Sequence, residues 1–162
     1  MTPFNKILES IENLADDLSA LQDPVYIIGS SALVLAGVPL EVTEDLDLLT
    51  SARDADFLKN RWQASKIEDY APKDSDKFRS RFARYQLGGV WVEVMGDLEV
   101  CNNNQWQKLR VHQYSELSIG QLKVRIPTLP EQERVFRLFG RSKDIVKADL
   151  ILKHIIQPDN GN

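Results

Sequence analysis

Residues 26–49, YIIGSSALVLAGVPLEVTEDLDLL, carry the strongest fold signal of the chain. An apolar run ends at Gly29-Ser30, a short apolar stretch follows, and Asp45 and Asp47 then stand one residue apart among leucines. This order predicts a strand, a glycine turn, a short helix from Ala32 capped by the serines, and a second strand. Carboxylates resist transfer out of water. Two of them in a leucine-rich strand therefore indicate a functional site.

The spacing of the two aspartates suggests what that site binds. Side chains alternate across a strand, so Asp45 and Asp47 project to one face, about 7 Å apart at the backbone. Like charges at that separation need a compensating cation, and Mg²⁺ prefers oxygen ligands while keeping waters that phosphates can replace. Gly29 and Ser30, at the start of a helix, offer N–H groups and a hydroxyl to a phosphate. The alternative is an edge strand with one solvated face.

Composition sets the limits within which this site is interpreted. The 162 residues favour one domain, residues 1–162, and 43 % hydrophobic with 27 % charged residues is typical of a globular protein. The net charge of −4 gives no general attraction to nucleic acid or to an anionic membrane. The single cysteine, Cys101, excludes an internal disulfide. No apolar run approaches the roughly 20 residues that span a bilayer, and no signal-peptide pattern is present, so we expect a cytoplasmic location without membrane contact.

Helical periodicity predicts further helices on both sides of the central motif. They are residues 3–21, a helix capped by Ser51 or Asp54 that reaches Trp62, residues 130–139 after a cap at Thr128, and residues 142–156 after a break at Gly140. The charged residues 66–77 predict a solvated loop.

Alternating residues around Gly88-Gly89 predict a hairpin with a two-residue turn. Facing residue numbers then sum to 177, so Arg84 faces Glu93. Val90, Val92 and Val94 should form the core face of the second strand, while Trp91, Glu93 and Met95 form the other. Trp91 there either stacks a nucleobase or covers the hairpin. Further short strands are expected at residues 98–101, 109–112 and 122–126.

Gly29-Ser30, followed after fourteen residues by Asp45-Leu46-Asp47, resembles the signature of the DNA polymerase beta-like nucleotidyltransferase superfamily. The resemblance implies an α+β nucleotidyltransferase fold: a small mixed sheet, helices packed on one face and a C-terminal helical segment at about 130–156. It also implies that the Gly29-Ser30 turn holds a triphosphate and that Asp45 and Asp47 bind two Mg²⁺ ions. Glu93 matches the third metal-binding acid, for which some members have aspartate.

The C-terminal stretch GRSKDIVKADL, residues 140–150, is similar to a helix of the minimal nucleotidyltransferases and of nucleotidyltransferase toxins of the abortive-infection type. This similarity implies that Lys143 contacts the phosphates, with Arg141 and Lys147 beside it and Asp144 as an orienting acid. The alternative is that these cations belong to a solvated helix face.

The implied reaction is magnesium-dependent transfer of a nucleoside monophosphate from ATP or another nucleoside triphosphate to an acceptor hydroxyl, with Asp47 or Glu93 helping to deprotonate that hydroxyl. The acceptor is a small molecule, an RNA or a protein. Two alternatives stay open: a non-catalytic binding or antitoxin-like module of the same fold, and a purely structural interaction domain. Glu93 is the residue that discriminates between the enzyme and these alternatives. If it only forms a surface ion pair with Arg84, it does not bind metal and the site is not catalytic.

Overall fold

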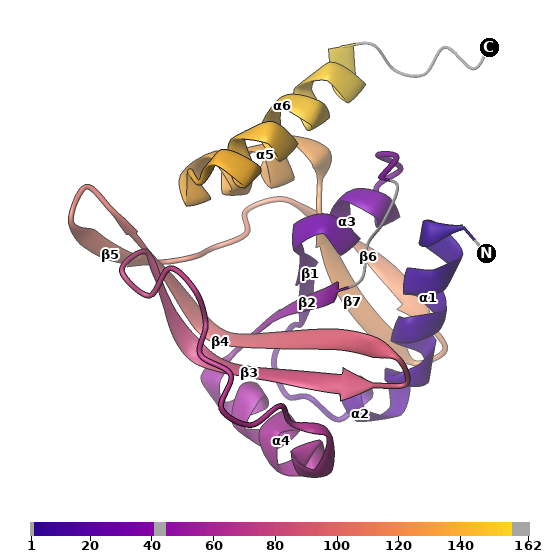
Figure 1. The fold of residues 1–162 in the computed structure, drawn as a ribbon. Coiled ribbons are helices and arrows are strands. Elements are labelled where there is room, and N and C mark those ends of the chain that lie inside the picture. Colours follow the sequence, from indigo (N-terminus) through magenta and orange to yellow (C-terminus); the bar gives the residue numbers. More distant parts are fainter. Residues whose placement is uncertain (1, 41–44, 157–162) are drawn as a thin grey trace.

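A computed structural model describes residues 2–40 and 45–156, which form a seven-stranded mixed sheet with helices on both sides (Figure 1). The strands are β1 (Tyr26–Ile28), β2 (Asp45–Thr50), β3 (Phe78–Leu87), β4 (Val90–Asn102), β5 (Gln105–Lys108), β6 (Tyr114–Ile119) and β7 (Leu122–Pro127). The helices are α1 (Pro3–Asn13), α2 (Ala15–Ser19), α3 (Gly29–Leu35), α4 (Ala52–Arg61), α5 (Leu129–Phe139) and α6 (Ser142–Ile156), with a 3₁₀ turn η1 (Gln63–Ser65). The predicted α+β class is confirmed. None of the helices described is long and apolar enough to cross a membrane.

The sheet order is β3-β4-β2-β1-β7-β6, with β5 paired to the outer part of β4. The central strand β2 is antiparallel to β1 and parallel to β4. In the β2–β4 register, Asp45 lies opposite Trp91 and Asp47 lies opposite Glu93. Directly opposed residues share a face of the sheet, so the acids of two strands meet on one face.

The two faces of β2 have opposite character because its side chains alternate. Leu46 and Leu48 are fully buried in the main core, which α1, α2 and α4 cover. Asp45 and Asp47 project to the other face, part of which is covered by α5. Helix α6 packs on α3 and α5, on the opposite side of the sheet from α4 (Figure 1). The C-terminal helical segment therefore lies over the acidic face of the sheet.

The β3–β4 hairpin follows the predicted register. Facing residue numbers sum to 177 from Leu87↔Val90 to Arg81↔Gly96, and a bulge then shifts the pairing by one residue. Both glycines of the turn have positive φ, at 57° and 80°. The valine face is confirmed as core for Val92 and Val94, which are buried.

Two predicted elements differ from the structure. The helix expected over 3–21 is interrupted at Leu14, whose N–H bonds the carbonyl of Ile11 instead of one four residues back. The strand expected over 109–112 does not form, because the Glu131 carboxylate of α5 accepts from the N–H groups of His112 and Gln113. Residues 98–101 are the continuation of β4.

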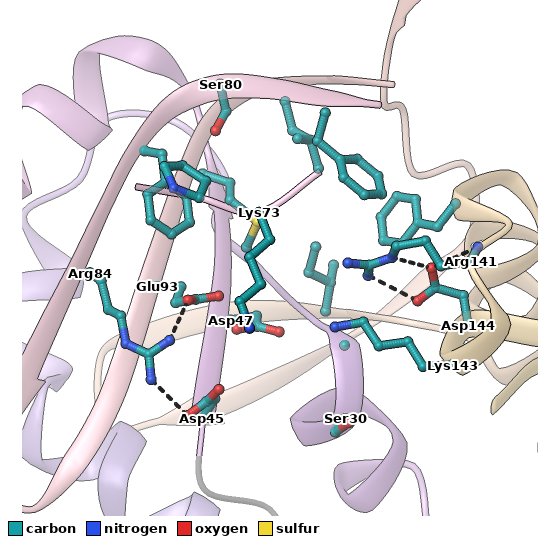
Figure 2. A pocket seen from close by; sticks show the side chains of 18 of the residues that line it. Ser30, Asp45, Asp47, Lys73, Ser80, Arg84, Glu93, Arg141, Lys143 and Asp144 are labelled. Carbon is teal, nitrogen blue, oxygen red and sulfur yellow. Dashed lines mark hydrogen bonds and ion pairs between the residues drawn. The ribbon is translucent and has the colours of Figure 1, made fainter. Parts of the chain in front are cut away.

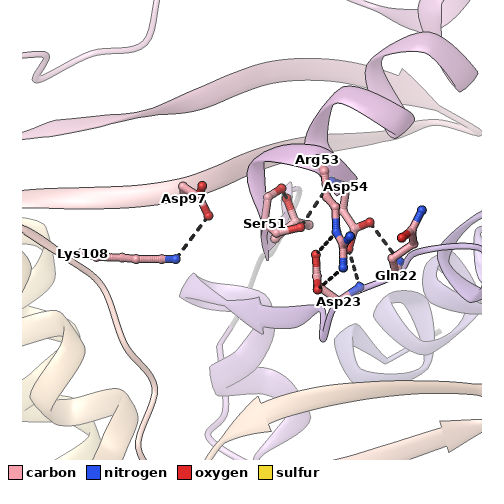
Figure 3. Close-up of polar contacts among 8 residues, drawn as sticks. Gln22, Asp23, Ser51, Arg53, Asp54, Asp97 and Lys108 are labelled. Carbon is pink, nitrogen blue, oxygen red and sulfur yellow. Dashed lines mark hydrogen bonds and ion pairs between the residues drawn. The ribbon is translucent and has the colours of Figure 1, made fainter.

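A hydrogen-bonded network fixes the end of β2 and the start of α4 (Figure 3). Of the two predicted caps, Ser51 and Asp54, Ser51 is the N-cap of α4 and accepts from the Asp54 N–H at 3.3 Å. The buried Asp54 carboxylate instead accepts from the N–H groups of Gln22 and Asp23, at 2.9 and 2.8 Å. Asp23 also pairs with Arg53 at 2.7 Å, which lowers the pKa of Asp23 to about 2. The network therefore ties the α2–β1 connection to the strand that carries the aspartates.

Candidate active site

A cavity of about 880 Å³ lies over the acidic face of the sheet (Figure 2). The β1–α3 turn, β2, β4 and α6 each contribute to its wall. Every site residue predicted from the sequence lines it: Gly29, Ser30, Asp45, Asp47, Glu93, Arg141, Lys143 and Lys147. The fold thus brings together residues that are more than 100 positions apart in the chain.

Gly29 lets the β1–α3 turn approach the aspartates. It has φ of +73°, and a Cβ on it would lie 2.4 Å from Oδ2 of Asp47. Any side chain here would both strain the backbone and displace that carboxylate. The predicted cap is wrong in detail, because α3 begins at Gly29 with Ile28 as its N-cap. Ser31 instead donates to the Ile28 carbonyl at 3.2 Å, while Ser30 lines the cavity.

Asp47 is the least compensated acid of the site. Its Oδ1 is fully enclosed and has no hydrogen-bond partner among the described residues. Burial, followed by the charges of Glu93 and Asp45, raises the pKa of the Asp47 carboxyl to about 7, against the opposing influence of Lys147 and Lys143. The carboxylate form is therefore costly unless another cation approaches.

Arg84 partly neutralises the other two acids. Its Nη1 donates to Oε2 of Glu93 at 2.8 Å, and its Nη2 lies 3.8 Å from Oδ1 of Asp45 (Figure 2). Its guanidinium also lies over the rings of Trp91 and Tyr70, 4.6 and 5.0 Å from their centroids. The predicted position of Arg84 opposite Glu93 is confirmed. The ion pair that the sequence left as an alternative also forms, and Glu93 still lines the same cavity as Asp47.

Helix α6 supplies positive charge from the opposite side of the cavity. Lys143 and Lys147 form no ion pair with any carboxylate of residues 2–40 or 45–156. Burial lowers the pKa of Lys147, with Asp144 opposing that change. Arg141 differs, because it donates to the buried Asp144 at 2.6 Å and pairs with Asp74 at 3.1 Å. The two lysines are therefore better placed than Arg141 to receive an anion.

Comparison with known proteins finds similar solved structures but no matching family model. No family model matches the chain, and no curated protein matches it. Among solved structures, a putative nucleotidyltransferase from Thermotoga maritima superposes with a TM-score of 0.71 at 20% identity, over 94% of each chain. The lincosamide antibiotic adenylyltransferase LnuA, in its lincomycin-bound form, superposes with a TM-score of 0.55 at 13% identity, over 91% of this chain and 95% of that one. ANT(2'')-Ia in complex with adenylyl-2''-tobramycin gives a TM-score of 0.51 at 15% identity, over 93% of this chain and 90% of that one.

The chain has the nucleotidyltransferase fold. This confirms the fold predicted from Gly29-Ser30 and the two aspartates. At these identities the likeness extends to the fold alone.

The cavity is also lined by residues that the sequence did not predict to belong to the site. Tyr70 and Lys73 come from the charged stretch 66–77, which was expected to be only a solvated loop. Lys73 points into the cavity (Figure 2) and has no carboxylate partner in the described part of the chain. The sequence signal was weak, because residues 66–77 contain only one isoleucine, one tyrosine, one alanine and one proline among charged residues and a serine. An apolar wall adjoins the charged part and consists of Ile28, Phe78, Met95, Leu98, Phe136 and Phe139.

The three acids in the cavity are suitable ligands for a hard divalent cation. Asp45, Asp47 and Glu93 offer only oxygen donors, which Mg²⁺ prefers, and the enclosed Oδ1 of Asp47 lacks a partner. Among the residues described, however, no three Asp, Glu, His or Cys side chains converge as a preformed metal site. Arg84 holds two of the acids instead. The donor set therefore fits a metal, provided that Arg84 gives way.

Proposed function

We propose that this protein transfers a nucleoside monophosphate from a magnesium-bound nucleoside triphosphate to a hydroxyl group of a small molecule. The observation that supports this most is that one cavity contains three acids on one side and, on the other, lysines that have no carboxylate partner among the described residues. This arrangement suits a metal-bound triphosphate, because the carboxylates would bind the metal and the lysines would bind the phosphate oxygens.

The triphosphate would lie between the Gly29-Ser30 turn and α6. Lys143 and Lys147 have no carboxylate partner among the described residues, so their charges are available to phosphate oxygens. Arg141 would stay with Asp144 and support this helix rather than bind directly. Removal of Lys143 should therefore weaken binding of a triphosphate more than binding of a monophosphate.

Asp45, Asp47 and Glu93 would hold the metal ions. When bound, two Mg²⁺ ions stabilise the charge on the attacking and leaving oxygens. The acceptor oxygen attacks the α-phosphorus, the bond to the bridging oxygen breaks, and pyrophosphate leaves. Asp47 or Glu93 would accept the hydroxyl proton, because both carboxylates line the cavity.

A small organic acceptor agrees best with the cavity. Its apolar wall, which includes Phe78, Met95 and Phe139, suits a compact, partly apolar molecule. LnuA and ANT(2'')-Ia, which share the fold, are described with lincomycin and with adenylyl-2''-tobramycin, respectively. The net charge of −4 gives no support to RNA as the acceptor.

A second candidate is a non-catalytic module that binds a nucleotide without metal. It is favoured by one observation, the contact of Arg84 with both Glu93 and Asp45. In such a module the arginine would hold these acids permanently, and Mg²⁺ would have no effect on nucleotide affinity.

Calorimetry with each of the four nucleoside triphosphates, with and without Mg²⁺, tests the proposal. We expect magnesium-dependent binding that disappears in the Asp45→Ala/Asp47→Ala variant. Asp56→Ala is the control, because this carboxylate pairs with Arg81 outside the cavity. Binding that does not depend on Mg²⁺ would favour the non-catalytic module, and no binding by the folded protein would refute both. If binding is found, transfer of labelled nucleotide to candidate acceptors, with release of pyrophosphate, tests the reaction.

A further inference from the structure

Arg84 lies among the acids of the cavity, although the sequence predicted it neither as a metal-binding nor as a phosphate-binding residue. It lies directly across from Glu93 in the β3–β4 register and contacts two of the three acids. Its side chain is only 18% exposed, and so is that of Glu93. This is an enclosed charge pair within the cavity, unlike the exposed ion pairs elsewhere on β3.

The acids need a cation whether or not a metal is present. Asp45 and Asp47 are on one face of β2, and Glu93 is opposite Asp47 on β4. Three carboxylates this close repel one another. Arginine remains charged at any pH at which a protein is folded, so Arg84 compensates Glu93 and Asp45 in the metal-free protein at every such pH. It leaves Oδ1 of Asp47 without a hydrogen-bond partner within the described ranges.

Arg84 also has a second set of partners that does not involve the acids. Its guanidinium lies over the rings of Tyr70 and Trp91, and its Nη1 is 3.5 Å from the Tyr70 hydroxyl. An arginine on aromatic faces keeps a favourable contact when its carboxylate partners turn away. Release of Glu93 and Asp45 would therefore not leave the guanidinium without contacts.

We propose that Arg84 is a built-in counter-ion that competes with a divalent cation for Glu93 and Asp45, and that withdraws onto Tyr70 and Trp91 when the metal-bound nucleotide enters. This inference rests on the proposed function. In it Arg84 is a positioning residue, because it acts through the two carboxylates. It keeps the acids together in the free protein and makes the affinity for free metal low. Metal then binds well only when it arrives with a nucleotide, whose phosphates supply additional contacts on α6.

Arg84→Gln tests this inference, with Arg79→Gln as the matched control. Arg79 is on the same strand, also lines the cavity, pairs with Glu99 at 2.9 Å and lies over the Trp106 ring. Both variants remove one positive charge, but only Arg84→Gln frees two of the three acids. Calorimetry with Mg²⁺ alone should show affinity at least about tenfold higher for Arg84→Gln than for wild type, because a charged hydrogen bond no longer competes. Arg79→Gln should resemble wild type. A residue with a merely structural role would give the opposite result, a weaker metal site after its removal.

NMR of the wild type gives a second test, in which the conservative variant Arg84→Lys serves only to assign the signals. The Arg84 side-chain N–H signals, assigned by their loss in Arg84→Lys, should shift on addition of Mg²⁺ with nucleoside triphosphate and should not shift with nucleotide alone. Unchanged Arg84 signals in the metal-bound nucleotide complex, or unchanged Mg²⁺ affinity in Arg84→Gln, would overturn the inference while leaving the proposed function standing. If the wild type binds no nucleoside triphosphate in the presence of Mg²⁺, the proposed function and this inference both fail.

Discussion

Replacing Asp47 by asparagine should stabilise the metal-free protein above neutral pH. The pKa of the Asp47 carboxyl is raised from 3.8 to about 7 in the folded state, so the folded protein binds this proton more tightly than the unfolded chain does. Stability is then highest below the ordinary pKa and decreases as the pH rises from about 4 to about 7. A difference of about 3 pH units, at about 1.4 kcal/mol each, amounts to about 4 kcal/mol. Asparagine has no charge to lose, so Asp47→Asn should avoid this cost.

Urea denaturation in the presence of a chelator measures the effect directly. We expect Asp47→Asn to exceed wild type in free energy of unfolding by up to about 4 kcal/mol at pH 8, and by little or nothing at pH 4. Asp56→Asn is the control, because Asp56 is 54% exposed and pairs with Arg81 at the surface. Equal stability of wild type and Asp47→Asn at pH 8, or the same difference at both pH values, would refute the reasoning that burial and the neighbouring acids raise this pKa.

Three further outcomes follow from the same contacts. Gly29→Ala should lower the free energy of unfolding by about 2–3 kcal/mol in urea denaturation, and Gly37→Ala by about 1 kcal/mol. Both glycines have positive φ, but of the two only an added Cβ at Gly29 would collide with another side chain. Equal losses in the two variants would contradict the close approach of Gly29 to Asp47. Asp54→Ala should lower the free energy of unfolding by about 2–4 kcal/mol, since two N–H groups lose their acceptor, while nucleotide affinity measured on the folded protein stays unchanged. Lys143→Ala should weaken triphosphate binding about tenfold in calorimetry, whereas Lys59→Ala on α4 should have no effect.

Local patterns were sufficient to predict the acids and their strands. Alternation alone places Asp45 and Asp47 on one face of β2, and the two-glycine turn alone sets Arg84 opposite Glu93. Each inference needs only residues that are close in the chain. Neighbouring residues carry little information, in contrast, about the parallel pairing of β2 with β4, which sets Glu93 opposite Asp47.

Several of the missed features depend on contacts between distant segments. The strand expected over 109–112 fails because a carboxylate of α5, Glu131, takes its N–H groups. Residues 66–77 contain few apolar side chains, so their sequence predicts a loop. It does not predict the ion pair of Asp74 with Arg141, which directly precedes α6. Whether a loop lysine such as Lys73 faces solvent or a cavity is decided by what the rest of the fold places beside it.

The construction of β2 explains why charge at this site has to be compensated by ligands or protons. Leu46 and Leu48, fully buried in the main core, hold one face of the strand, and hydrogen bonds to β1 and β4 hold both edges. The strand therefore cannot move to separate Asp47 from Glu93. Their repulsion is relieved only by what comes to the carboxylates: a proton on Asp47, the guanidinium of Arg84 or a divalent cation. Each of the three reduces the negative charge that attracts the other two, so proton uptake, arginine contact and metal binding should each weaken the others.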